Sequence, residues 1–163
     1  MRALLRLRQS LSKTEFISQW KSQIWPFLEY PSGVLGLACD SQLSRLDSFQ
    51  RGFLNELEIT EEEAFLEHNF LPPTLRRRIA LLGFCHKVAL GPNFCHPTLV
   101  AALPCTEDDQ GAKVFRCNPV LCTEFRERLF SRILYGALIY YNSICSASRR
   151  TPSVETFQSG LTS

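Results

Sequence analysis

Apolar residues recur at helical spacing along most of the chain, and turn residues separate the resulting segments. Residues 12–15 (SKTE) form a capping box, whose hydroxyl and carboxylate satisfy the first free N–H groups of a helix. That helix is expected to kink or restart at Pro26 and to end at residues 30–33 (YPSG). Its predicted buried face consists of Ile17, Trp20, Ile24 and Phe27.

Two more helices follow. Asp40 is a candidate N-cap for the first, and residues 60–63 (TEEE) form a capping box whose acidic first turn suits the dipole of the second. The second helix is short and is expected to stop at residues 71–73 (LPP). The apolar positions predicted for the first are Leu43, Leu46, Phe49, Phe53 and Leu57.

The clearest helix covers residues 75–90 (LRRRIALLGFCHKVAL), with Thr74 as its cap and Gly91-Pro92 as its end. Its predicted buried stripe consists of Leu75, Ile79, Leu82 and Ala89. A short helix is then expected from Pro97 to Leu103.

The last third of the chain alternates polar and apolar stretches. Residues 104–119 are polar and turn-rich, which predicts a linker or a poorly ordered loop with extended backbone at Val114 and Phe115. A long helix is predicted for 120–141, and after a loop at 145–153 a final helical turn begins at the cap Ser153. The predicted face of the long helix is Phe125, Leu129, Ile133, Gly136 and Tyr140, and the final turn holds Phe157 and Leu161.

These segments predict an all-α fold, a small bundle of about five to seven helices with Pro and Gly breakers. Its divisions are 1–103, the loop 104–119, and 120–163 as a long helix plus a C-terminal tail. The composition agrees, because 45% apolar and 21% charged residues are typical of a folded domain. With 12 Phe and one Met, the core is expected to be built on aromatic residues and Leu.

No targeting or membrane-spanning segment is apparent in this sequence. Arg2, Arg6 and Arg8 interrupt the first apolar stretch, so the continuous apolar core of a signal peptide is missing. Of the two longest uncharged runs, 88–106 contains three prolines, and 133–148 is shorter than the ~20 residues that a spanning helix needs. We therefore expect an intracellular protein of the nucleus or cytoplasm that is not secreted and does not contact membranes.

The cysteines and histidines lack the spacing of a metal or catalytic site. Zinc sites use tight pairs of Cys or His, and only Cys117 and Cys122 approach such a pair. Cys85 and His86 are neighbours on a predicted helix, so their side chains diverge by ~100°. The thiols of this pair, of Cys95-His96 and of the later cysteines are interpreted as small core hydrophobes. No Gly-rich phosphate loop and no nucleophile signature occur, so no metal, cofactor or small-molecule substrate is predicted. A small Cys-ligated metal domain is kept as an alternative.

The charges are sorted along the chain despite a net charge of only +2. Residues 1–21 hold five basic residues and one acid, whereas residues 55–68 hold six acids and no base. The run 76–78 (RRR) stands in a first helical turn, where cations oppose the helix dipole. Two interpretations stay open: a basic groove for a nucleic-acid backbone, or pairing of these arginines with Glu61, Glu62, Glu63 or Glu67.

Read in order, several segments resemble the C-terminal part of the reverse transcriptase polyprotein of LINE-type (non-LTR) retrotransposons. The most specific match is 63–87, from Glu63-Ala64-Phe65-Leu66 through LPPTLRRRIALLGFCHK. Residues 20–30 (WKSQIWPFLEY) and 43–54 (LSRLDSFQRGFL) are similar to two preceding helices of the family. Residues 141–143 (YNS) and 157–161 (FQSGL) resemble motifs near the end of the polyprotein. Two departures are Arg78, where the family commonly has an acid, and Ile144-Cys145, where it has Leu-Pro.

The resemblance implies the helical thumb and the stretch that follows it, without polymerase chemistry. The family's catalysis rests on palm carboxylates that hold two metal ions, including a Tyr/Phe-Ala-Asp-Asp motif, and this sequence has no such motif. The palm and endonuclease regions of the polyprotein have no counterpart in this sequence, so Met1 is expected to start inside the ancestral frame. The region 1–103 is then thumb-like, and the chain is not expected to be an enzyme.

The favoured hypothesis is therefore a noncatalytic, all-α fragment of a retroelement reverse transcriptase that binds a nucleic-acid backbone weakly and without sequence preference, or has no selected function. Losing the palm is also expected to expose an apolar face and to favour self-association. The alternative is a helical protein-interaction module, in which the basic residues are incidental. The candidates for backbone contact are Arg6, Arg8, Lys13, Lys21, Arg76, Arg77, Arg78 and Lys87.

Overall fold

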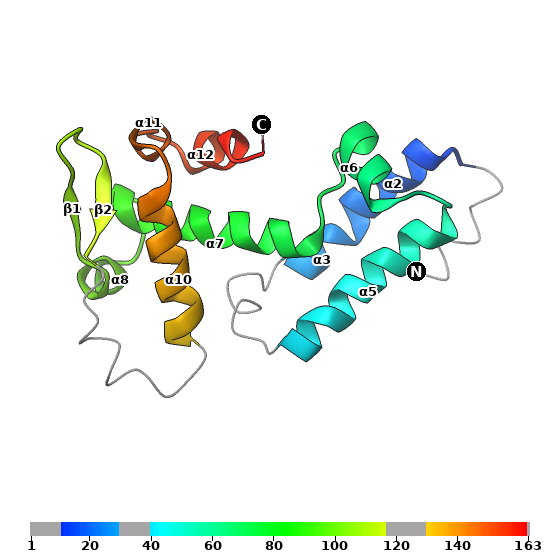
Figure 1. Cartoon of the computed structure of the whole chain (residues 1–163), viewed down its shortest axis with the longest axis horizontal. Coiled ribbons are helices and arrows are strands. Elements are labelled where there is room, and N and C mark those ends of the chain that lie inside the picture. The colour runs from blue at the N-terminus through cyan, green and yellow to red at the C-terminus, as the bar shows by residue number, and fades with distance from the viewer. Residues whose placement is uncertain (1–10, 30–39, 117–129, 163) are drawn as a thin grey trace. The chain divides into compact units, whose positions relative to one another are not determined.

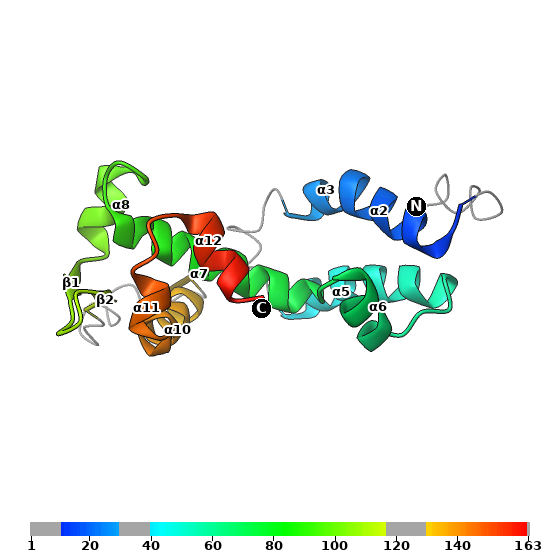
Figure 2. The same ribbon diagram turned by 90° about the horizontal axis from the view of Figure 1, so that it is seen from above.

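The computed structural model describes residues 11–29, 40–116 and 130–162. In those ranges the chain is mostly helical, with one two-stranded sheet, which confirms the all-α prediction (Figures 1 and 2). Backbone contacts divide the chain into two compact units, Met1–Arg77 and Arg78–Ser163, called unit 1 and unit 2 below. The sequence predicts different boundaries, between residues 103 and 104 and between residues 119 and 120.

The described residues of unit 1 form four helices and the first turn of a fifth. They are α2 (Lys13–Gln23), α3 (Trp25–Glu29), α5 (Asp40–Glu56), α6 (Glu61–His68) and the start of α7 (Pro73–Leu90). Trp20 of α2 is fully buried and stacks on Phe53 of α5, with 3.8 Å between ring centroids. The other core side chains around this pair are Phe16, Ile17, Leu54, Leu57, Ile59, Ala64 and Phe70.

Local capping explains where two of these helices begin. The Ser12 hydroxyl accepts a hydrogen bond from the Glu15 N–H, and the Glu15 carboxylate accepts one from the Ser12 N–H at 2.8 Å, which confirms the predicted capping box. The Thr60 hydroxyl likewise accepts from the Glu63 N–H at 3.1 Å. The helix α6 ends earlier than the LPP signal, at Asn69, whose φ of 48° stops the helix.

Two expectations for unit 1 are wrong. Phe27 is 80% exposed rather than buried, because a new helix, α3, begins at Trp25 and the side-chain register of α2 does not continue. Trp25 takes the inward place and stacks on Phe70 at 4.9 Å. The helix α7 begins at Pro73, so Thr74 lies inside its first turn and is not the cap. The breaker predicted at 30–33 lies outside the described residues.

Unit 2 combines the rest of α7 with short elements. They are α8 (Pro97–Ala102), β1 (Cys105–Glu107), β2 (Lys113–Phe115), α10 (Phe130–Ser143), α11 (Ser146–Arg149) and α12 (Val154–Gly160). β1 and β2 pair antiparallel, with Thr106 opposite Val114. The predicted loop 104–119 is therefore a hairpin at 105–115, because Asp108 hydrogen-bonds the N–H groups of Gln110 and Ala112 and closes the turn.

The buried face of α10 differs from the predicted one. Tyr140 is 60% exposed and Gly136 is also exposed, whereas Ala137, Leu138 and Tyr141 are buried. The face is rotated by one residue because Tyr141 packs between segments distant in sequence, with Phe115 at 5.3 Å and Phe157 at 5.6 Å. The predicted positions Phe125 and Leu129 lie outside the described residues. On α7, Leu82 and Ala89 are buried as predicted, whereas Leu75 is exposed.

No helix within the described ranges is long and apolar enough to cross a membrane.

Candidate nucleic-acid contacts

Two of the basic candidates form a stack with an aromatic ring in unit 1. The Arg76 guanidinium lies 3.3 Å from the centroid of Trp25, and the Lys21 ammonium lies 5.4 Å from the same ring. Lys21 also donates a hydrogen bond to the His68 carbonyl. Burial lowers the pKa of Arg76 to about 10, and burial together with the nearby Arg76 charge lowers the pKa of Lys21. These cations are therefore held by the fold and are partly withdrawn from solvent.

Arg77 is an ion-pair residue of unit 1. Its two terminal nitrogens donate to the two carboxylate oxygens of Asp47 at 2.8 and 3.1 Å. Both side chains are largely buried, at 14% and 18% exposure, so the pair is bidentate and poorly screened. The predicted pairing with the acidic helix is thus wrong for Arg77. Glu61 of that helix pairs with Arg51 of α5 at 3.1 Å.

The remaining candidates belong to different parts of the chain. The Lys13 ammonium donates to the Glu58 carbonyl in unit 1, at 3.3 Å. Arg78 and Lys87 are exposed in unit 2, and no described residue forms an ion pair or hydrogen bond with either. They are nine residues apart on α7, which places them on opposite sides of that helix. Arg6 and Arg8 lie outside the described residues.

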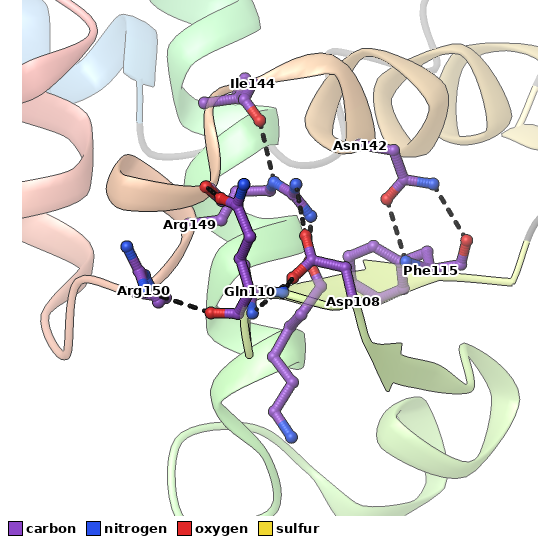
Figure 3. A network of polar contacts seen from close by, with 10 residues as sticks. Asp108, Gln110, Phe115, Asn142, Ile144, Arg149 and Arg150 are labelled. Carbon is purple, nitrogen blue, oxygen red and sulfur yellow. Dashed lines mark hydrogen bonds and ion pairs between the residues drawn. The ribbon is translucent and has the colours of Figure 1, made fainter.

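A second polar arrangement, which the sequence did not reveal, surrounds Arg149 in unit 2 (Figure 3). The side chain is 7% exposed and donates to the carbonyls of Ile144 and Lys113 and to the Asp108 carboxylate, at 2.8–2.9 Å. Asn142 of α10 completes the attachment, because its amide pairs with both backbone groups of Phe115 at 2.9 Å. The hairpin is thereby fastened to α10 and α11. Arg149 lies within the predicted loop 145–153, and no structural role is predicted for it from the sequence.

His86 is buried at the centre of unit 2 with both ring nitrogens bonded. Nε2 lies 2.9 Å from the Thr151 carbonyl, which only accepts, so Nε2 carries the proton. Nδ1 then accepts from the Tyr141 hydroxyl at 2.8 Å. The ring also stacks on Phe157 at 4.2 Å. Burial lowers the pKa of His86 and so favours the neutral ring, whose two nitrogens both have partners within unit 2.

This arrangement predicts a loss of stability in mild acid. The pKa of His86 is lower in the folded chain than its ordinary unfolded value of about 6.5, so the unfolded chain binds more protons below that pH. The contribution of neutral His86 is therefore complete above about pH 6.5 and declines as the pH falls. Urea unfolding at pH 7.5 and 5.5 measures it. The variant His86→Gln should lose much of this pH dependence, and an unchanged dependence would contradict the assignment.

Residues from three separate segments of the chain meet in unit 2. His86 contacts Tyr141 and Phe157, and these two rings contact each other. Gln158 donates to the Ile79 carbonyl at 3.3 Å and lies directly over Gly83, where any Cβ would collide with it. A Cβ at position 83 would therefore displace the end of the Gln158 side chain from this place.

The described residues contain no group of three or more His, Cys, Asp or Glu that could hold a metal ion. Cys85 is buried in the core of unit 2, whereas Cys145 is exposed. Cys117 and Cys122 lie outside the described residues. Comparison of the chain with models of protein families, with curated proteins and with solved structures finds no match.

Proposed function

We propose that the chain is a noncatalytic helical module related to the thumb and downstream region of a LINE-type reverse transcriptase. The observation that supports this proposal is the meeting of three resemblance segments in one core. Gly83 and His86, Tyr141, and Phe157 with Gln158 pack together in unit 2. The residues on which the resemblance rests thus have a common structural role, and no paired carboxylates of the palm type occur in this sequence.

We further propose that the chain contacts the nucleic-acid backbone weakly and through few residues. Arg76 and Arg77 are engaged within unit 1, by Trp25 and Asp47. Arg78 and Lys87 are exposed and have no described partner, which leaves their charges available to phosphates. With Arg6 and Arg8 from the basic N-terminal segment, they are the remaining candidates of the predicted set.

Contacts through these few cations predict salt-sensitive binding of low affinity. A fluorescent RNA–DNA hybrid titrated with the chain should bind with a micromolar or weaker dissociation constant at physiological salt. The affinity should be independent of sequence and should fall with log salt at about 0.9 log units per phosphate contacted. Undetectable binding at low salt, or a strong preference for one sequence, would contradict the proposal.

Primer extension tests the noncatalytic part of the proposal. Because the sequence has no palm-type Asp-Asp motif, the purified chain with Mg²⁺ or Mn²⁺ should give no product above a protein-free control. An active polymerase run in the same reactions confirms that the template and nucleotides are competent. Template-dependent synthesis by the purified chain would contradict this expectation.

A second candidate function is a helical protein-interaction module. Two large apolar side chains of unit 1 favour it, since Phe27 and Leu66 are 80% and 78% exposed. A chain that uses them should self-associate or capture a partner, and Leu66→Asp should abolish that association without changing the fold. Sedimentation of the chain and of this variant over a range of concentrations distinguishes this candidate from the first.

A further inference from the structure

The β-hairpin of unit 2 has one edge that side chains close. On β2, the Asn142 amide bonds both backbone groups of Phe115 (Figure 3), and Arg149 donates to the Lys113 carbonyl. These side chains come from α10 and α11, and β2 is the strand that lies next to α10 (Figure 1). A further strand therefore has no place at the β2 edge.

The β1 edge is open. Two backbone hydrogen bonds flank the paired residues and fix which pairs of the ladder are hydrogen-bonded. They join the Asp108 N–H to the Ala112 carbonyl, at 2.8 Å, and the Arg116 N–H to the Pro104 carbonyl, at 3.1 Å. Because hydrogen-bonded and non-hydrogen-bonded pairs alternate in an antiparallel ladder, the polar backbone groups of Thr106 face β2, and those of Cys105 and Glu107 point away from it. Within the described ranges, no residue hydrogen-bonds to the backbone of Cys105 or Glu107.

The outward groups of β1 are complementary to those of a second β1. An open strand edge is a template for pairing with another strand. When two copies of β1 run antiparallel with Thr106 opposite Thr106, Cys105 of each copy faces Glu107 of the other. Each facing pair then exchanges two N–H···O=C bonds, so every outward donor and acceptor of both strands has a partner. The charges permit this pairing, because the Lys113 ammonium lies 2.7 Å from the Glu107 carboxylate and neutralises it.

We propose that two copies of the chain associate through their β1 strands and form a four-stranded antiparallel sheet. The contact is weak, with a dissociation constant on the order of 1 mM, because so short an edge buries less surface than a stable interface needs. This inference goes beyond the proposed function and is independent of it. It uses neither the exposed cations nor the exposed apolar residues Phe27 and Leu66.

A concentration series of ¹H–¹⁵N spectra tests which groups pair. The full chain is kept in reducing buffer, so that Cys105 forms no disulfide between copies. From micromolar to about millimolar concentration, the N–H resonances of Cys105 and Glu107 should move downfield as the dimer forms. The Thr106 N–H is the internal control, because it is already bonded within the hairpin, and it should move severalfold less. Unchanged Cys105 and Glu107 resonances would overturn the proposal.

A mixture of ¹³C-labelled and unlabelled chains identifies the partner strand. Thr106 and its counterpart form a non-hydrogen-bonded pair, in which the two α-hydrogens face each other. A filtered NOE between copies is therefore expected between these two α-hydrogens. Association without this NOE, or association that Leu66→Asp abolishes, would overturn the proposal in favour of another surface.

Two variants of Glu107 separate its backbone N–H from its side chain. Both Glu107→Pro and Glu107→Ala remove the ion pair with Lys113, but only proline removes the N–H, and proline is tolerated at a sheet edge. Glu107→Pro should weaken the association at least tenfold through lost hydrogen bonds, and Glu107→Ala should change it by about twofold or less, because exposed ion pairs contribute little. Equal association of the two variants would contradict the proposal. The Phe115 N–H resonance reports whether the hairpin is intact, and the NOE of the unaltered chain decides the test if Glu107→Pro disrupts it.

Discussion

Replacing Trp20 with Ala should destabilise unit 1 by about 3–5 kcal/mol, the usual cost of emptying a large aromatic site in a core. The Trp20 ring is fully buried and contacts Phe53 at 3.8 Å and Phe49 at 5.3 Å, so no rearrangement of surface side chains refills the space. The loss is about a third or more of the stability of an ordinary domain. Chemical denaturation followed by tryptophan fluorescence measures it, because the second tryptophan, Trp25, also belongs to unit 1.

Phe27→Ala is the matched control for this change. It removes an aromatic ring from the same segment of the chain, but that ring is 80% exposed. We expect its effect to stay within about 0.5 kcal/mol, as for surface substitutions in general. If Phe27→Ala were as destabilising as Trp20→Ala, Phe27 would be a core residue, and the statement that α3 does not continue the side-chain register of α2 would be wrong.

The second large effect is expected at Arg149. Arg149→Ala removes the side-chain donor to the carbonyls of Ile144 and Lys113 and to one oxygen of the Asp108 carboxylate. Removing one partner of a buried pair is strongly destabilising, and we expect about 3 kcal/mol, the low end of the range, because Asp108 is partly exposed. Urea unfolding followed by far-UV circular dichroism measures the loss.

The neighbouring arginine provides the comparison. Arg150 is exposed and donates to the Gln110 carbonyl at 3.1 Å, so Arg150→Ala should cost less than about 1 kcal/mol. Equal effects of the two substitutions would show that the three buried hydrogen bonds of Arg149 do not hold the hairpin to α10 and α11.

Features that depend on neighbouring residues were predictable from the sequence. At Ser12, Thr60 and Ser153 a hydroxyl accepts from the backbone N–H three positions further on, and the structure contains all three caps. The reciprocal half of a capping box is present at residues 12–15. The end of α7 was also predicted, because Gly91 adopts a φ of 101° that other residues rarely adopt. Each of these is a local interaction that a short stretch of sequence specifies.

Features that depend on residues distant in the sequence could not be predicted from the sequence. The predicted face of α10 included Tyr140, but Tyr141 is buried, because Phe115 and Phe157 are the residues that meet this helix. Similarly, the run 76–78 looks uniform in the sequence, yet the partner of Arg77 is Asp47, 30 positions earlier. Periodicity reveals that a helix has a buried face, and the contacts between helices decide which residues form it.

The proposal that Arg77 stabilises the fold while Arg78 contacts nucleic acid is tested most directly by comparing Arg77→Ala with Arg78→Ala. For Arg77→Ala we expect a loss of about 2 kcal/mol in the free energy of unfolding, from the broken bidentate pair with Asp47, and unchanged affinity for the RNA–DNA hybrid. For Arg78→Ala we expect stability within about 0.5 kcal/mol, weaker binding on every sequence and a salt slope reduced by about one. If Arg77→Ala weakened hybrid binding while leaving stability intact, or Arg78→Ala left binding unchanged, the account would be contradicted.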